Sequence, residues 1–220
     1  MIYKAVIFDL DGTLLDTLQD LGDSVNRVLE MYNFPLHTLE EYRLIIGNGA
    51  KNLIETSFPK DTSPELIDEA LSNFKNTYRD HFIDKTRPYE GICDMLTELY
   101  KCGIKISVCS NKHNDAVITL VNLLMPKDIF VCIHGERAGI PRKPDPTSAF
   151  DIAREMGVST QETVYVGDSM VDMQTGKNAG MLPVGVLWGF RSKKELMDHG
   201  AVVLLSNPSE LMQKISFACK

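Results

Sequence analysis

The sequence has few features of a secreted, membrane-spanning or nucleic-acid-binding protein. No apolar stretch in its 220 residues approaches the ~18 residues that cross a bilayer. The N-terminus lacks the long apolar segment and cleavage site of a signal peptide. The formal net charge is −7, and the pair Lys193-Lys194 is too short to form a basic patch. These deficits predict a globular protein with no nucleic-acid partner and no membrane partner.

Cysteine is sparse and unordered in the sequence. The five cysteines form no CxxC pair and no Cys/His ligand set, and their odd number does not suggest a disulfide framework. Such a pattern fits reduced thiols in a cytoplasmic protein. The five histidines are equally scattered. We expect His113 and His134, which lie near segments of interest, to be surface or capping residues rather than ligands.

What the sequence does contain is a pair of acids after its first apolar run. Residues 5–8 are short, apolar and rich in β-formers, which predicts a buried strand. Asp9 and Asp11 follow it, and Gly12-Thr13 predicts a turn. Ligands of open α/β sheets bind beyond the carboxyl ends of strands, so the pair is a candidate site. The alternative is a solvated acidic turn after an edge strand.

Residues 16–87 carry only helical signals. Apolar residues recur at helical spacing from Leu18 to Val28. Thr38 begins a capping box, and Ser63-Pro64 predicts the start of another helix. A helical insert of this length does not belong to a sheet, so residues 16–87 are expected to form a helical lid or cap domain.

From residue 88 onward, expected strands alternate with expected helices. Such alternation is typical of a parallel sheet wrapped by helices. The predicted fold is therefore α/β, with a doubly wound, Rossmann-like core domain formed by residues 1–15 and 88–220. The expected strands cover residues 104–109, 129–133, 163–166 and 182–187, with a short edge strand at 202–205.

Polar residues follow several of these strands. In a parallel sheet such segments meet at one edge. Several carboxylates gathered there would repel one another unless they were neutralised. A hard divalent cation would relieve that repulsion, and Mg²⁺ suits a site that also holds a phosphate. The segments are Asp9 and Asp11, Ser110-Asn111-Lys112, Arg142-Lys143-Pro144-Asp145-Pro146, Asp168 and Asp172.

Two of these segments suit a phosphate group. Ser110 opens a turn into a helix, where a hydroxyl and free backbone N–H groups can bind phosphate oxygens. Lys143 would supply a positive charge for the same phosphate. Ser110 could instead cap the next helix, and Lys143 competes with Arg142 and Lys112 for the neutralising role.

The segments DLDGTLLDT, VCSNK, RKPDP and VGDSMVDM, in this order and spacing, resemble the four motifs of the haloacid dehalogenase-like phosphohydrolases. The match spans the whole chain. The helical insert between the first two motifs resembles the small helical cap of the phosphoglycolate phosphatase-like branch. The resemblance therefore implies a Mg²⁺-dependent phosphatase that acts on a small phosphorylated metabolite.

The resemblance also implies residue roles. Asp9 would attack phosphorus and form an aspartyl-phosphate. Asp11 would protonate the leaving oxygen and then take a proton from the hydrolytic water. Mg²⁺ would be held by the Asp9 carboxylate, the Asp11 backbone carbonyl and Asp168, with Asp172 as an outer partner. The transferring phosphoryl oxygens would be held by Ser110, the Asn111 N–H and Lys143.

Single residues discriminate between the other reactions that this family catalyses. Asp11 argues against a dehalogenase and against a phosphonate hydrolase, which would also need a cap lysine such as Lys51. A sugar-phosphate mutase like β-phosphoglucomutase shares all four motifs, but Thr13 favours a phosphatase. A pyrophosphatase stays open. A receiver-type signalling module, from a different class, would carry its phosphoacceptor after the third strand, where this chain has no Asp.

The cap sequence suggests a substrate. Arg43, near the loop 47–49, could clamp a carboxylate with two hydrogen bonds, which would suit 2-phosphoglycolate. The alternative for both Arg43 and Lys51 is a solvated helix face. Small sugar phosphates also remain candidates.

Overall fold

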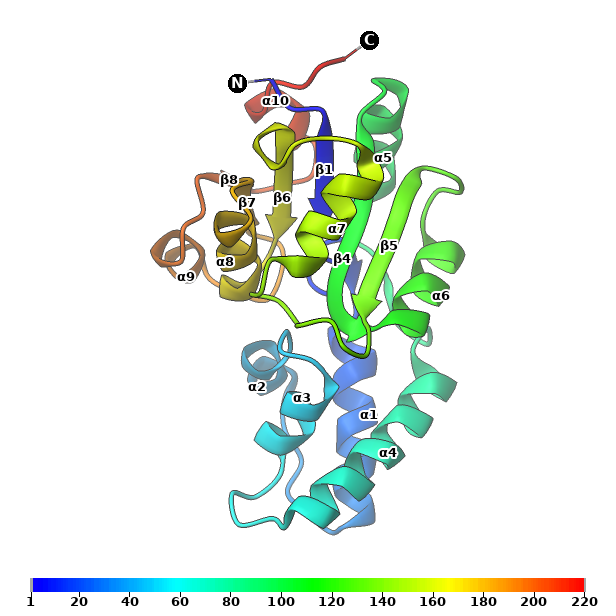
Figure 1. Cartoon of the computed structure of the whole chain (residues 1–220). Coiled ribbons are helices and arrows are strands. Elements are labelled where there is room, and N and C mark those ends of the chain that lie inside the picture. Colours follow the sequence, from blue (N-terminus) through cyan, green and yellow to red (C-terminus); the bar gives the residue numbers. More distant parts are fainter. Residues whose placement is uncertain (1, 220) are drawn as a thin grey trace. The chain divides into compact units, whose positions relative to one another are not determined.

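The computed structural model describes residues 2–219. The chain separates into two compact units (Figure 1). The core unit contains the residues up to Leu15 and those from Pro88 onward, and the helical unit is Asp16–Arg87. Among the described residues, no helix is both long enough and apolar enough to cross a membrane.

A six-stranded sheet organises the core unit. Its order is β5-β4-β1-β6-β7-β8, and every neighbouring pair is parallel. This sheet confirms the doubly wound α/β class that the alternation of strands and helices predicted. Its strands are β1 (Ala5–Phe8), β4 (Lys105–His113), β5 (Phe130–Glu136), β6 (Thr163–Gly167), β7 (Leu182–Val186) and β8 (Val203–Leu205).

Helices cover both faces of this sheet. In Figure 1, α7 and α8 lie over one face, and α5 and α10 over the other. Ala5 and Ile7 of β1 share a buried cluster with Ile152 and Met156 of α7. The helices are α5 (Ile92–Lys101), α6 (Asn114–Leu124), α7 (Thr147–Met156), α8 (Met170–Asn178), α9 (Lys193–Asp198) and α10 (Glu210–Lys214), with a 3-10 turn at Thr160–Glu162.

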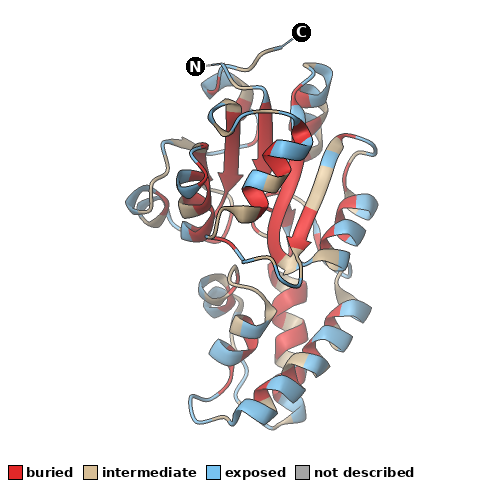
Figure 2. Ribbon diagram, in the orientation of Figure 1, coloured by how far each residue is buried: buried red, intermediate tan, exposed pale blue. Residues whose placement is uncertain are grey.

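The position of β1 creates the site. It lies in the middle of the sheet, and all four of its residues are buried, as Figure 2 shows. Phe8, its last residue, is level with Val108 of β4 and Val166 of β6. The chain passes to one side of β1 with β4 and β5 and then to the other with β6. Such a reversal is where α/β sheets bind ligands, so Asp9 begins at the expected place.

The helical unit contains four helices whose ends follow local sequence signals. Thr38 forms the predicted capping box with Glu41, and Ser63 caps a helix that begins with Pro64. Both caps satisfy N–H groups that the first helical turn leaves unpaired. The helices are α1 (Leu18–Met31), α2 (Leu39–Ile45), α3 (Ala50–Ser57) and α4 (Pro64–His81).

The chain passes between the units at two short strands that the sequence did not indicate. These are β2 (Leu15–Asp16) and β3 (Arg87–Pro88), which pair with each other. Two-residue strands are too short to show a period-2 pattern. Nearby, the buried Asp20 carboxylate accepts the backbone N–H groups of Lys85 and Thr86 at 2.8–3.0 Å. Asp20 thereby ties the end of the helical unit to its first helix.

Two expectations need correction. Strand β4 continues through the polar segment to His113, beyond the expected end at residue 109, because its pairing with β5 continues to Glu136. His134 is neither a surface nor a capping residue. It is buried on β5 with 6% of its surface exposed, because the ring lies against Glu155 of α7.

Candidate active site

The carboxyl edge of the sheet gathers the polar side chains that the sequence singled out. Asp9 follows β1, Ser110 lies in the last part of β4, and Asp168 follows β6. All three are buried, with exposed fractions of 7%, 6% and 2%. Buried polar groups persist only when they are paired or neutralised, so this concentration calls for specific partners.

Lys143 supplies the first of those partners. Its ammonium nitrogen lies 2.8 Å from Asp9 Oδ1 and 2.7 Å from Asp172 Oδ1, and its side chain is 4% exposed. Burial alone would lower the pKa of Lys143, but Asp172 and then Asp9 raise it above its ordinary value. Lys143 is therefore a permanently charged ammonium group between two carboxylates.

Asn111 positions this lysine through the backbone. Its side-chain Nδ2 donates to the Lys143 carbonyl at 3.2 Å, and its Oδ1 accepts the Lys143 N–H at 2.9 Å. This reciprocal pair ties the end of β4 to the loop before α7. From the sequence, a role was expected only for the backbone N–H of Asn111, as a donor to the phosphoryl oxygens.

The three candidates for neutralising the phosphate contact different carboxylates. They are Lys112, Arg142 and Lys143. Arg142 forms an ion pair with Glu136, at a more exposed position. Lys112 lies 2.8 Å from Asp11 Oδ1 and 3.0 Å from Oδ2. Of the three, the structure brings Lys143 to Asp9. Ser110 Oγ accepts the Lys112 N–H at 3.2 Å, which orients the hydroxyl.

Three carboxylates form a dense acidic cluster. Asp9, Asp168 and Asp172 are all buried, and one oxygen of each lies within 4.8 Å of the others. Burial first, and Asp172 second, raise the pKa of Asp9 to about 7, while Lys143 acts in the opposite direction. The pKa of Asp168 is raised well above its usual range, again by burial and then by Asp172 and Asp9. In their ionised forms the three acids would therefore carry more negative charge than Lys143 alone neutralises, and the raised pKa values report that repulsion.

The cluster fits a hard divalent cation. Its donors are carboxylate oxygens, which such ions prefer. Asp9 Oδ1 is buried, and its contact with Lys143 leaves the atom able to bind a cation as well. Gly12 has φ +80°, and a Cβ there would lie 2.2 Å from Asp168 Oδ2. A backbone without a side chain at Gly12 is therefore needed beside the acids.

Two further groups hold these acids in place. Ser169 caps α8 by accepting the Asp172 N–H, while its own N–H and hydroxyl donate to Asp172 Oδ2 at 3.1 and 2.5 Å. The Ser-x-x-Asp spacing is a capping signal that sequence reading could have found. The Phe190 backbone N–H donates to Asp168 Oδ2 at 2.6 Å. No sequence pattern marks that contact, because the two residues lie on separate loops.

The proposed cap residues lie in the helical unit. Arg43 is on α2, 3.5 Å from Glu40 and with 39% of its side chain exposed. Lys51 is on α3 and pairs with Asp68 at 3.2 Å. Both are partly exposed, and the geometry of the helical unit leaves their roles as predictions.

Known proteins share this arrangement of strands and motifs. The profile of the haloacid dehalogenase-like hydrolases matches residues 6–186, which include most of β1, Lys143 and Asp168. The chain is a haloacid dehalogenase-like hydrolase. It is 32% identical to a phosphoglycolate phosphatase of Pseudomonas putida over 94% of this chain and 75% of the relative. The family and the branch that the four motifs indicated are thereby confirmed.

Solved structures agree with the fold of this hydrolase. A proposed phosphoglycolate phosphatase from Lactobacillus delbrueckii subsp. bulgaricus has a TM-score of 0.92 and 34% identity, covering 98% of this chain and 99% of that one. The hydrolase is also 26% identical to an N-acetylmuramic acid 6-phosphate phosphatase of Pseudomonas aeruginosa over 99% of this chain and 97% of that relative. Relatives with different substrate names therefore match nearly the whole of this chain.

Proposed function

We propose that this hydrolase removes the phosphate of small phosphomonoesters with Mg²⁺, and that 2-phosphoglycolate is its preferred substrate. The observation that carries the proposal is the contact of Lys143 with Asp9. A buried carboxylate at the end of the central strand lies 2.8 Å from a buried ammonium group and beside two further acids. Such a site can hold a phosphoryl group next to a nucleophilic oxygen.

Asp9 is the proposed nucleophile. A carboxylate oxygen of Asp9 attacks phosphorus, the bond from phosphorus to the ester oxygen breaks, and an aspartyl-phosphate forms. Lys143 favours the ionised form of Asp9, which the attack requires. Water then attacks the aspartyl-phosphate, inorganic phosphate leaves, and the Asp9 carboxylate is restored.

Asp11 is the proposed general acid and base. It donates a proton to the departing ester oxygen in the first step and takes one from water in the second. The Lys112 ammonium contacts both carboxylate oxygens of Asp11. Lys112 thus limits the orientations of Asp11, which is the role of a positioning residue.

The oxygens of the transferred phosphoryl group need hydrogen-bond donors. Ser110 Oγ, the Asn111 N–H and Lys143 are the proposed donors, because all three belong to segments at the carboxyl edge of the sheet. Donors fixed in a buried site stabilise developing charge without reorganising during the reaction.

The proposed metal ligands are Asp9, the Asp11 carbonyl and Asp168, with Asp172 outside them. Mg²⁺, when bound, neutralises part of the charge of the acids and of the phosphoryl oxygens. Asp172 contacts Lys143 and Ser169, so its own contribution is to hold the lysine and the first turn of α8.

The helical unit is the proposed cap, formed by residues 16–87 as the sequence predicted. A cap that excludes water strengthens electrostatic contacts within the site and favours a small substrate. Relatives named phosphoglycolate phosphatase support 2-phosphoglycolate, and Arg43 is the proposed partner of its carboxylate. A cytoplasmic location stays a prediction of the sequence.

A panel of phosphate esters assayed with Mg²⁺ tests the proposal. We expect kcat/KM to be highest for 2-phosphoglycolate, with lower values for sugar phosphates, N-acetylmuramic acid 6-phosphate and pyrophosphate. A higher value for one of the others would reassign the substrate and keep the phosphatase. Conversion of β-glucose 1-phosphate to glucose 6-phosphate faster than any hydrolysis would replace the phosphatase with a mutase.

A further inference from the structure

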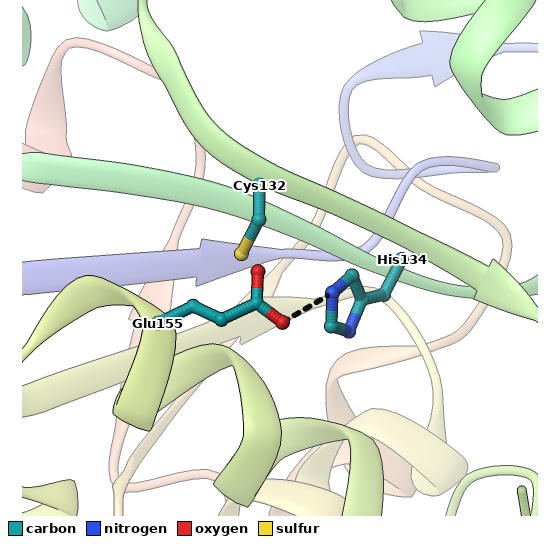
Figure 3. Close-up of side chains that lie close together, drawn as sticks. All are labelled: Cys132, His134 and Glu155. Carbon is teal, nitrogen blue, oxygen red and sulfur yellow. Dashed lines mark ion pairs between the residues drawn. The ribbon is translucent and has the colours of Figure 1, made fainter.

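Outside the proposed active site, the core unit holds a second cluster of metal-ligating side chains. Cys132 and His134 lie on β5, and Glu155 lies on α7, which packs against that strand (Figure 3). Residues two apart on a strand point to the same face, so the Cys-x-His spacing places both side chains toward α7. The sequence analysis did not expect a Cys/His ligand set, because the third member comes from another element.

The ligand atoms of the three residues are close together. The Cys132 sulfur, a nitrogen of His134 and a carboxylate oxygen of Glu155 all lie within 4.8 Å of one another. His134 Nε2 is 3.0 Å from Glu155 Oε1. Ligands on one tetrahedral Zn²⁺, with bonds of about 2.0–2.3 Å, lie about 3.5 Å apart. The cluster would therefore need to contract by about 1.3 Å at most.

The hydrogen bonds of His134 show which ring nitrogen carries the proton that a metal cation would replace. Arg137 Nη2 is 3.0 Å from His134 Nδ1 and can only donate, so the ring carries its proton on Nε2 and directs it at Glu155. Burial, and then Arg137, lower the pKa of His134, which favours the uncharged imidazole. Burial mainly raises the pKa of the Cys132 thiol to about 11, so without a metal the thiol is protonated and a poor nucleophile.

Accessibility also suits a metal site. His134 is buried, but about half of the Glu155 side chain is exposed. Edge strand β5 contains intermediate and exposed residues, unlike β1 (Figure 2). An ion could thus enter from solvent, and a water molecule could complete a coordination shell of three protein ligands.

We propose that Cys132, His134 and Glu155 form a second metal site, selective for Zn²⁺ and related transition metals. Thiolate and imidazole ligands select such ions over Mg²⁺ and Ca²⁺, which prefer oxygen donors. On binding, the thiol releases its proton to solvent and the sulfur bonds the metal. The imidazole bonds through Nε2 and keeps one proton, which moves to Nδ1. Glu155 supplies the third ligand.

The Arg137 guanidinium disfavours metal binding by His134, and this effect on metal affinity can be measured. After the shift of the ring proton, Nδ1–H faces the guanidinium, which has no acceptor atom, so Arg137 must turn away. A glutamine at this position could accept the Nδ1 proton through its amide oxygen. A histidine ligand binds a metal more tightly when its second ring nitrogen donates a hydrogen bond to such an acceptor.

Titration of the full-length protein with Co²⁺, in saturating Mg²⁺ that occupies the acidic cluster, tests the proposal. We expect one equivalent of Co²⁺ to produce a thiolate-to-cobalt charge-transfer absorption band, which Zn²⁺ then abolishes by displacement. The all-oxygen cluster of Asp9, Asp168 and Asp172 cannot produce this band, because it has no sulfur ligand.

Variants assign the ligands. Cys132→Ser should abolish the band, and Glu155→Gln should weaken Co²⁺ binding by about tenfold or more. Arg137→Gln should tighten binding severalfold. The matched control is Cys102→Ser, which removes the thiol that interacts with Cys219 and should leave the titration unchanged. Because the Glu155 side chain is half exposed, its variant keeps the test valid if Cys132→Ser disturbs folding.

Three outcomes of the absorption measurement would overturn the proposal. They are the absence of a charge-transfer band in the unmodified protein, a band that persists in Cys132→Ser, and a band that disappears in Cys102→Ser. Unchanged Co²⁺ affinity in Glu155→Gln would likewise remove Glu155 from the site and with it the three-residue ligand set.

Discussion

The Lys112 ammonium lies 2.8 and 3.0 Å from the two carboxylate oxygens of Asp11, and both side chains are largely buried. Lys112 belongs to the second motif, VCSNK, and Asp11 belongs to the first, DLDGTLLDT. The contact therefore joins two residues that are 101 positions apart in the sequence. In the proposed mechanism Asp11 transfers the proton, so the lysine controls where that proton is delivered.

Lys112→Met should therefore impair substrates according to their leaving groups. An alkyl phosphate needs a proton on its departing oxygen, so we expect its kcat to fall by about tenfold when Asp11 is less well positioned. p-Nitrophenyl phosphate releases a stable phenolate and should lose less than about threefold. Lys101→Met, at an exposed helix position, serves as the control. Equal losses for both substrates would show that Lys112 does not act through proton transfer.

Asp9→Asn should abolish phosphatase activity, with a loss of ~10³-fold or more, because an amide cannot form the acyl-phosphate. The fold should survive, since the change removes one charge from a cluster whose acids repel one another. Steady-state assays and thermal unfolding of the purified variant measure both effects. Near-normal turnover would exclude Asp9 as the nucleophile.

Removal of divalent metal should abolish hydrolysis. We expect excess EDTA to stop the reaction and Mg²⁺ to restore it, because Asp9, Asp168 and Asp172 repel one another when all three are ionised and Lys143 supplies one positive charge. Ca²⁺ should inhibit, since it prefers longer bonds and more ligands than Mg²⁺. Full activity in EDTA, with metal content verified by elemental analysis, would contradict this prediction.

Arg43→Ala tests the proposed partner of the substrate carboxylate. We expect kcat/KM for 2-phosphoglycolate to fall by about tenfold or more, mainly through a higher KM, because ground and transition states share that contact. p-Nitrophenyl phosphate lacks the carboxylate and should be affected far less. Arg79→Ala, an exposed change on α4, is the matched control. Equal effects on the two substrates would indicate a structural role for Arg43.

Asp20→Ala should destabilise the helical unit by about 2–4 kcal/mol, because the N–H of the buried Thr86 would lose its acceptor and the Lys85 N–H would lose its hydrogen bond as well. Urea unfolding followed by circular dichroism measures the change. Asp80→Ala, at an exposed position, should cost less than about 0.5 kcal/mol. Equal stability of the two variants would show that the Asp20 contacts contribute little.

Local sequence patterns predicted most of the secondary structure of this protein. The apolar run at residues 5–8 became β1, and Thr38 and Ser63 cap the helices that they were expected to begin. These features depend on neighbours within a few positions, so the sequence determines them directly. The four motifs likewise identified the family, because each is a short contiguous segment.

Contacts between distant segments were decided only by the tertiary structure. The sequence predicted that Lys112, Arg142 and Lys143 would lie near the carboxyl edge of the sheet, but not which of them would contact Asp9. Sheet order and the Asn111 contacts bring Lys143 there, while Lys112 reaches Asp11. The physical reason is that hydrophobic periodicity and capping signals report an element's own geometry. They contain no information on which side chains meet when separate strands and loops pack together.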